Sequence, residues 1–167
     1  MIVADFEIEW CSSPELADDL AAFFVANIDA LYISHGEIQD GRALDENAWN
    51  PELQTILTEE FQAACSTGGL GVPGLAVAVA SFAGERVGVA LVEHVRHNRG
   101  AYLVLHDLMI HREYRGRGLG NRILGWIEQA SRETGLSQIF LESGKRNDAA
   151  HHFFQARGYC ATSLGKV

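Results

Sequence analysis

The residues with the clearest chemical role form a loop rich in glycine and arginine, Tyr114 to Asn121 (Tyr-Arg-Gly-Arg-Gly-Leu-Gly-Asn). The loop lies where a strand-like pattern ends and a helix-like pattern begins. Glycines let the backbone turn sharply there and leave several N–H groups pointing outward. The partial positive charge of a helix N-terminus and the full charges of Arg115 and Arg117 add to these donors. The combination predicts a cradle for phosphate.

Three phosphate-loop patterns can be compared with this segment. A Walker A loop requires Gly-Lys-Ser or Gly-Lys-Thr, and the sequence contains neither. A dinucleotide fingerprint requires Gly-x-Gly-x-x-Gly, but the glycines at 116, 118 and 120 have the wrong last spacing. The pattern (Arg/Gln)-x-x-Gly-x-(Gly/Ala) is met in full by Arg115, Gly118 and Gly120.

This third pattern resembles the pyrophosphate loop of the GNAT superfamily of N-acetyltransferases, which binds coenzyme A. The loop follows the run LHDLMIHREY, as a strand precedes it in the family. The later segment LESGKRNDAAHHFFQARGY is similar to the family's last helix, through Asn147, Ala150, Phe153, Phe154, Gly158 and Tyr159. The resemblance has specific motifs over about residues 101–159; before them only the order of elements agrees.

The resemblance implies which residues bind acetyl-CoA. In the family the strand before the loop pairs its backbone with the pantetheine arm, a role that corresponds here to Leu108, Met109 and Ile110. The pyrophosphate would be held by the loop residues Arg115, Gly116, Arg117, Gly118, Leu119, Gly120 and Asn121. Asn147 resembles the asparagine that reaches the cofactor from the last helix. No metal is expected, because the adjacent His151 and His152 would point about 100° apart on a helix.

Acetyl transfer to an amine also requires a neutral nitrogen. An alkylammonium with a pKa of about 10 is neutral in only about one molecule in a thousand at pH 7, a deficit of roughly 4 kcal/mol. His106 and Asp107 are the candidate bases, since they align with an acidic pair in polyamine acetyltransferases of the superfamily. Alternation along a strand would send the two side chains to opposite faces. We place His106 ahead because the ordinary pKa of a histidine suits base work near neutrality; Glu93 and His94 are secondary candidates.

One residue departs from the family's pattern. Where the family usually has a tyrosine that protonates the leaving thiolate, this chain has Phe154. A thiol with a pKa of about 8.5 can leave without help, so the departure leaves the acid step open. Tyr159, His151, His152 and Ser143 are alternative donors close in sequence.

The surrounding pattern predicts the elements that position these residues. Strands are expected at 2–10, 75–83, 87–95, 101–111, 137–142 and 159–166. Helices are expected at about 14–31, 51–67, 119–135 and 147–157. The order indicates an α/β fold, a single domain over residues 1–167 with a mixed, mainly antiparallel, GNAT-like central sheet flanked by helices on both faces. Residues of about 14–67 would form the acceptor side, and about 101–159 the acetyl-CoA core.

Composition narrows the classes of partner. The net charge is −9, with 14 acidic side chains and only Arg42 as a basic one in residues 1–60. This disfavours nucleic acid, which requires broad positive charge. No apolar run approaches the roughly 20 residues of a membrane span, and the N-terminus has no signal-peptide pattern. Cys11, Cys65 and Cys160 share no CxxC or Cys/His spacing, so they indicate reduced thiols in a cytoplasmic protein.

The sequence therefore predicts an acetyl-CoA-dependent N-acetyltransferase for a primary amine of a small, cationic acceptor, working by direct attack in a ternary complex. Two alternatives stay open: a non-catalytic acyl-CoA-binding regulatory module, which Phe154 would suit, and a protein N-terminal or lysine acetyltransferase. A homodimer is also expected, because the predicted strand 159–166 would end the sheet with an exposed edge.

Overall fold

The structure, a computed structural model, describes residues 5–160. They form two compact units. The first takes in the chain up to Asn27 together with Gln54–Leu141, and the second takes in Ile28–Leu53 together with the chain from Glu142 onward. No helix in the described part is long and apolar enough to cross a membrane.

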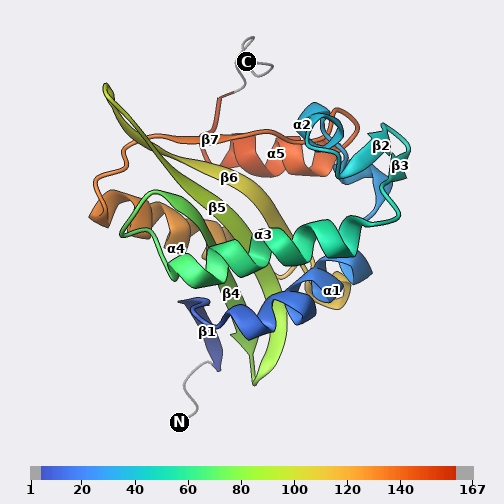
Figure 1. Cartoon of the computed structure of the whole chain (residues 1–167), viewed down its shortest axis with the longest axis horizontal. Coiled ribbons are helices and arrows are strands. Elements are labelled where there is room, and N and C mark those ends of the chain that lie inside the picture. Colours follow the sequence, from blue (N-terminus) through green and yellow to red (C-terminus); the bar gives the residue numbers. More distant parts are fainter. Residues whose placement is uncertain (1–4, 161–167) are drawn as a thin grey trace. The chain divides into compact units, whose positions relative to one another are not determined.

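The first unit is built on a five-stranded sheet in the order β1-β4-β5-β6-β7 (Figure 1). The strands are β1 Phe6–Trp10, β4 Gly74–Phe82, β5 Glu85–His97, β6 Gly100–Ile110 and β7 Ile139–Leu141. All neighbours pair antiparallel except β6 and β7, which run parallel. This confirms the predicted mixed, mainly antiparallel sheet.

The hairpin between β4 and β5 follows from two residues with left-handed backbone. Ala83 has φ 51° and Gly84 has φ 82°. Two such residues in succession form the tight turn whose twist matches that of the flanking strands. Phe82 and Glu85 pair directly across it, so β5 begins two residues earlier than the sequence pattern predicted.

Helices cover both faces of this sheet. β5 is buried without a break over residues 87–92, so neither of its faces meets solvent there. A Cβ added to Gly88 would lie 2.5 Å from Cδ1 of Ile123, which places α4 (Leu119–Glu133) on the Gly88 face. Helices α1 (Ala17–Asn27) and α3 (Leu53–Thr67) lie on the other face (Figure 1), where Phe24 and Phe61 contact edge to face.

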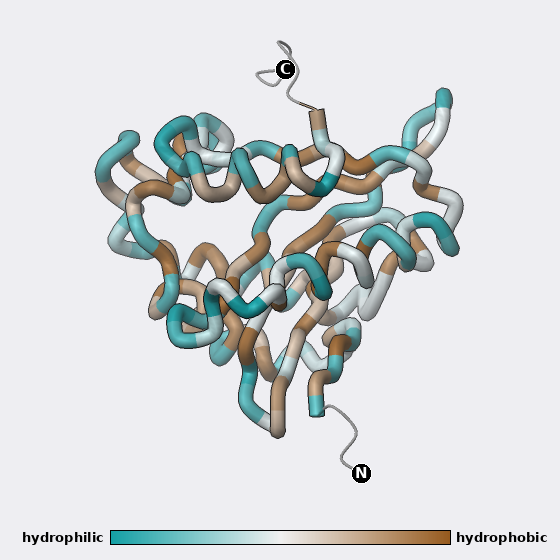
Figure 2. The backbone as a smooth tube through the Cα atoms, turned by 180° about the vertical axis from the view of Figure 1, so that it is seen from behind, coloured by the Kyte–Doolittle hydropathy of each residue, from teal (hydrophilic) through white to brown (hydrophobic). Residues whose placement is uncertain are grey.

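The hydrophobic core follows the predicted strands. Figure 2 shows the hydrophobic colouring gathered along the strands, and the largest fully buried side chains include Leu91, Leu103 and Met109 of β5 and β6. The buried residues of α4 recur at helical spacing, which packs one side of the helix on the sheet; they are Leu119, Ile123, Leu124, Ile127 and Ser131.

The first helix is shorter than the apolar pattern indicated. Ile28 and Leu31 continue the pattern, but α1 ends at Asn27. The Asn27 side chain donates from Nδ2 to the carbonyl of Phe23 at 2.7 Å, and its Oδ1 accepts from the backbone N–H of Arg112 at 2.9 Å. The buried asparagine thus satisfies the helix end and fixes it to the chain after β6.

The second unit contains short elements that the sequence pattern did not predict. They are the turns η2 Ala30–Tyr32 and α2 His35–Gln39 and the hairpin β2 Ala43–Asp45 with β3 Ala48–Trp49. The unit also holds α5, Asp148–Ala156, as predicted. The strand expected at 159–166 falls mainly outside the described residues, and Tyr159 and Cys160 are not in a strand.

Candidate active site

Strand β6 carries both predicted bases at a break in its register with β5. Leu91 pairs with Asp107, after which the register shifts by one residue, so His106 is the extra residue of a β-bulge. Asp107 therefore shares a sheet face with Leu91, and Glu93, two residues further along β5, lies on that same face. Because His106 Nε2 lies 2.9 Å from Glu93 Oε1, the bulge turns both candidate bases to one face. The expected alternation of their side chains was wrong for this reason.

The two candidates differ in access to solvent. The side chain of His106 is 34% exposed and that of Glu93 39% exposed, whereas Asp107 is only 8% exposed as a residue. The imidazole is therefore more accessible from solution than the Asp107 carboxylate.

His94, one of the secondary candidates, is a buried structural residue. It is 2% exposed, and its Nδ1 lies 2.9 Å from the carbonyl oxygen of Leu70. A carbonyl only accepts, so Nδ1 carries the proton and Nε2 accepts from Nη2 of Arg96 at 3.3 Å. Both ring nitrogens are thus occupied, and His94 is not available as a base.

The backbone of β6 loses its partner on one side at this same bulge. The parallel pairing with β7 joins Leu103 to Ile139 and ends at Leu105 with Leu141, whereas β6 continues to Ile110. In the described residues, the β7-facing edge from His106 onward has no strand partner. The predicted pantetheine-pairing residues Leu108, Met109 and Ile110 all fall in this stretch, though the carbonyl of Ile110 accepts from Nε of Arg115 at 3.0 Å.

The glycine-rich loop begins directly after this edge. Gly116 has φ 78° and Gly118 has φ 79°, a left-handed conformation that side chains with a Cβ rarely adopt. Gly118 is also the N-cap of α4 and provides no side chain to bond the first N–H groups of the helix. The amides of Leu119, Gly120 and Asn121 are thus presented at the positive end of the helix dipole, as an anion site requires.

The two loop arginines have different surroundings. The guanidinium of Arg115 donates from Nη2 to the carbonyl of Asn27 at 2.6 Å, and from Nε to the Ile110 carbonyl. It therefore fastens the C-terminus of α1 to the loop, where a cation is favoured by the helix dipole. Arg117 instead lies over the ring of Tyr114, 5.1 Å from its centroid. Of the two, Arg115 is the one whose guanidinium is bound to backbone carbonyls.

Tyr114 fastens the start of the loop to the sheet. Its hydroxyl donates to Oε2 of Glu85 at 2.8 Å, and this hydrogen bond raises the pKa of Tyr114 above its usual value of 10.0. The phenol therefore keeps its proton at neutral pH and stays a donor to β5. The hydrogen bond of Tyr114 holds the start of the loop, and helix α4 holds its end. The amides between them therefore keep fixed directions.

In the second unit, Asn147 is the N-cap of α5. Its Oδ1 accepts from the backbone N–H of Ala150 at 3.1 Å, which leaves the Nδ2 hydrogens as the donors that could serve a cofactor. Phe154 contacts the rings of Phe153 and Tyr159 edge to face. Phe154 therefore lies within a group of aromatic rings.

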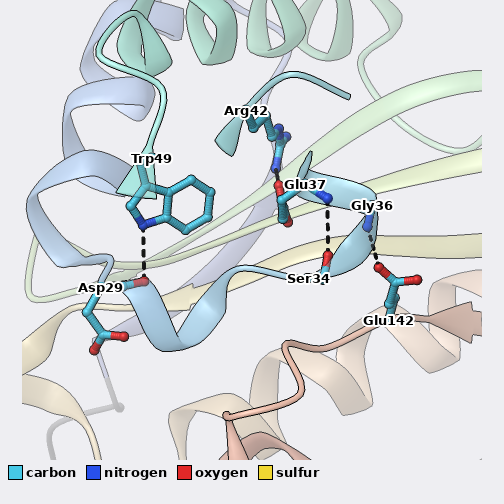
Figure 3. Close-up of polar contacts among 7 residues, drawn as sticks. All are labelled: Asp29, Ser34, Gly36, Glu37, Arg42, Trp49 and Glu142. Atoms are coloured by element: carbon cyan, nitrogen blue, oxygen red, sulfur yellow. Dashed lines mark hydrogen bonds and ion pairs between the residues drawn. The ribbon is translucent and has the colours of Figure 1, made fainter. Parts of the chain in front are cut away.

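Residues 29–49 of this unit, part of the stretch that the sequence predicts as the acceptor side, are held by polar contacts that the sequence did not reveal (Figure 3). Arg42, the one basic residue of the acidic first third, forms a buried ion pair with Glu37 at 3.1 Å. Gly36 N–H donates to Oε1 of Glu142 at 2.7 Å, and Trp49 donates to the carbonyl of Asp29 at 3.1 Å. Glu37 and Glu142 therefore stabilise the fold of this segment.

The chain is similar to known acetyltransferases. The model of the acetyltransferase (GNAT) family matches residues 38–159. A stretch of 63 residues is 35% identical to the uncharacterized N-acetyltransferase YesJ of Bacillus subtilis (strain 168), covering 38% of this chain and about a third (34%) of that protein.

Two solved structures have the same fold. One is an aminoglycoside acetyltransferase from an uncultured soil metagenomic sample in complex with sisomicin, with a TM-score of 0.62, 16% identity and coverage of 95% and 91% of the two chains. The other is the aminoglycoside N-acetyltransferase AAC(6')-Iy in complex with CoA, with a TM-score of 0.63, 12% identity and coverage of 97% and 92%.

The family match begins at residue 38 and continues through the bulged strand β6 and the glycine-rich loop to residue 159, and the fold agrees with it. The chain therefore belongs to the GNAT family of acetyltransferases.

Proposed function

We propose that the protein is an acetyl-CoA-dependent N-acetyltransferase that transfers the acetyl group to a primary amine of a small, cationic acceptor. The observation that carries this proposal is the backbone edge of β6, which loses its β7 partner at Leu105 and leads to the uncapped start of α4. An edge of unpaired peptide groups suits the amides of a pantetheine arm. Outward N–H groups at a helix N-terminus suit a pyrophosphate.

In this proposal the loop and strand divide the work of binding. Leu108 and Met109 hydrogen-bond the pantetheine through their backbone, while their side chains remain packed. The amides from Arg117 to Asn121 hold the pyrophosphate, assisted by the charge of Arg117. Arg115 acts mainly by holding the loop in place, since its guanidinium is bound to two carbonyls. Asn147 remains the predicted contact from α5.

The transfer itself would be direct attack in a ternary complex. His106 or Asp107 removes a proton from the acceptor ammonium, which restores the nucleophilic lone pair of the nitrogen. Without a base, deprotonating an alkylammonium at pH 7 costs roughly 4 kcal/mol. The amine then attacks the thioester carbonyl. The leaving thiolate, whose conjugate acid has a pKa of about 8.5, departs without a dedicated tyrosine acid. Phe154 would thus slow the reaction rather than prevent it.

Two observations support a small cationic acceptor. Residues 1–60 carry 14 acidic side chains and a single basic one, and that one is neutralised by Glu37. Two structures with this fold are aminoglycoside acetyltransferases, one of them bound to sisomicin.

The proposal is tested by the release of CoA when acetyl-CoA and a panel of amines are supplied. Polyamines, aminoglycosides, amino acids and a peptide with a free N-terminus should be compared, with free CoA and acetylated product both quantified by chromatography. CoA should appear in equal amount with an acetylated cationic amine. Binding of acetyl-CoA without CoA release for any amine would instead indicate a regulatory module, and product only from the peptide would indicate a protein acetyltransferase.

A further inference from the structure

Glu93 forms a side-chain contact with the candidate base His106, and the proposed transfer step gives this contact no role. Glu93 lies on β5 and His106 on β6, and their side chains meet at 2.9 Å between Oε1 and Nε2. Glu93 pairs with Val104 across the two strands, and His106 lies two residues beyond Val104 on β6. The bulge at His106 places Asp107 opposite Leu91, and it follows directly on Leu105, where the pairing of β6 with β7 ends.

The chemistry of the two groups fixes the proton on the ring. An ionised carboxylate has only acceptor sites, so a hydrogen bond to it requires an N–H on the imidazole. Nε2 must therefore carry the proton. In the neutral ring this leaves the lone pair on Nδ1, for which the described residues provide no hydrogen-bond partner. A base needs an unprotonated nitrogen held in a fixed direction, and this arrangement supplies one.

We propose that Glu93 is a positioning residue that holds His106 in its Nε2–H tautomer, so that Nδ1 is the base for the acceptor amine. The inference rests on the proposed function and deepens it by choosing His106 over Asp107. The exposure of the pair agrees with this choice, since Asp107 is almost buried.

The proton balance of the proposed step is simple. Nδ1 takes one proton from the acceptor ammonium, and the neutral nitrogen forms the C–N bond to the thioester carbonyl as the C–S bond breaks. A second proton of that nitrogen passes to the leaving thiolate, giving CoA thiol and the acetylated amine. His106 then returns its proton to water. Glu93 remains ionised throughout and only holds the ring.

The first test is Glu93→Gln, which keeps the shape of the side chain but removes the charge and adds an N–H donor. Because the amide can either donate to or accept from Nε2, the tautomer is no longer fixed. We expect kcat to fall about tenfold to a hundredfold, less than the roughly 10²–10⁴-fold that loss of the general base itself would cost, with the KM for acetyl-CoA unchanged. Glu9→Gln, which removes the same charge from β1, is the matched control and should leave kcat unchanged. Glu93→Asp should recover part of the loss.

A double-mutant cycle and the ring spectrum separate positioning from a structural effect. If Glu93 acts through His106, Glu93→Gln should cost nothing further in a His106→Gln background. Nitrogen-15 NMR of the histidine rings, with His106 assigned by its loss in His106→Gln, should show the Nε2–H tautomer in the intact chain and a mixture in Glu93→Gln.

The possible outcomes overturn different claims. An active chain in which Glu93→Gln behaves like Glu9→Gln, or lowers kcat equally with and without His106, overturns the role of Glu93 alone. A spectrum showing Nδ1–H in the intact chain does the same. An intact chain that releases no CoA with any amine overturns the proposed function, and this role with it.

Discussion

At the scale of single residues, the proposed acetyl-CoA site depends on backbone conformation as much as on side-chain chemistry. Gly118 illustrates this, because it forms the cap of α4 with φ 79° and has no atom within 4 Å of where a Cβ would lie. What requires glycine here is the dihedral angle alone. The angle in turn sets the direction of the amides that are proposed to hold the pyrophosphate.

Gly118→Ala should therefore weaken acetyl-CoA binding by about tenfold or more, equivalent to about 1.4 kcal/mol. Gly135→Ala is the matched control, since Gly135 follows the other end of α4 with φ 84° and equally open surroundings. Both variants should lose about 1 kcal/mol of stability from left-handed strain. Thermal unfolding and calorimetric titration measure the two effects, and an equal loss of affinity in both variants would refute the assigned role of Gly118.

The cysteines show a residue-level contact that sequence spacing concealed. Cys11 and Cys65 are 54 residues apart, yet their sulfur atoms lie 2.8 Å apart in the core, and both are free thiols. Burial is the main cause that raises the pKa of Cys65 from 9.0 to about 12, with the hydrogen bond to Cys11 next.

This shift predicts a loss of stability at high pH. Between pH 9 and about 12 the unfolded chain ionises this thiol and the folded chain does not, so protons leave only on unfolding. The free energy of unfolding should fall by up to about 1.4 kcal/mol per pH unit in this window and be unaffected below it. Cys65→Ala should lessen the slope, whereas Cys160→Ala, at an exposed site, should not. The free energy of unfolding is measured by urea unfolding at a series of pH values. An equal fall with pH in the intact chain and in both variants would show that Cys65 is not the titrating group.

At the scale of elements, the C-terminus of α1 and the glycine loop are joined by polar contacts. Asn27 and Arg115 form this junction, and Arg115 reaches both the Asn27 carbonyl and the end of β6. The sequence motif alone predicts that Arg115 binds phosphate. In the structure its guanidinium instead joins two elements of the fold.

Arg115→Ala and Arg117→Ala should accordingly have different effects. Removing Arg115 leaves two carbonyls without their charged donor, so stability should fall by roughly 1–2 kcal/mol and loop disorder should weaken acetyl-CoA binding as well. Removing Arg117 loses only an exposed contact with Tyr114 and should cost less than about 1 kcal/mol, while affinity still falls. Differential scanning calorimetry and titration compare them; an unchanged melting temperature for Arg115→Ala would overturn the structural role.

The elements also show how far the sequence could predict the site. Periodicity located every strand of the described sheet and the three long helices, because their apolar residues recur at strand or helix spacing. The β-bulge was not predictable, since a one-residue shift at His106 leaves no mark on the apolar pattern of β6. The short elements of the second unit were missed for a related reason: α2 and the β2–β3 hairpin are held by Arg42, Glu37 and Trp49 through polar contacts rather than by a repeating apolar face.

At the scale of the whole molecule, the main property is an acidic charge of −9 around a small basic loop. If this field attracts a cationic acceptor, the attraction must weaken with salt, because the screening length falls from about 10 Å at 0.1 M to about 3 Å at 1 M.

The KM of a polyamine acceptor should therefore rise several-fold between these salt concentrations, while that of a singly charged alkylamine of similar length rises much less. Initial rates at saturating acetyl-CoA give both values. Identical salt dependence for the two amines would indicate that the acidic residues only solvate the surface.

The oligomeric state is also a property of this scale. In the described residues β7 pairs only with β6, so its outer edge is one place where a second copy could pair. We expect a homodimer in sedimentation velocity at micromolar concentration, and a single monomeric boundary would remove this expectation.

The central claim is that the unpaired edge of β6 and the start of α4 together bind acetyl-CoA. The most direct measurement is a calorimetric titration of the intact chain with acetyl-CoA. We expect one site per chain with a dissociation constant in the micromolar range. Absence of binding at millimolar acetyl-CoA would contradict it, and would leave the chain with the family's fold but without the proposed chemistry.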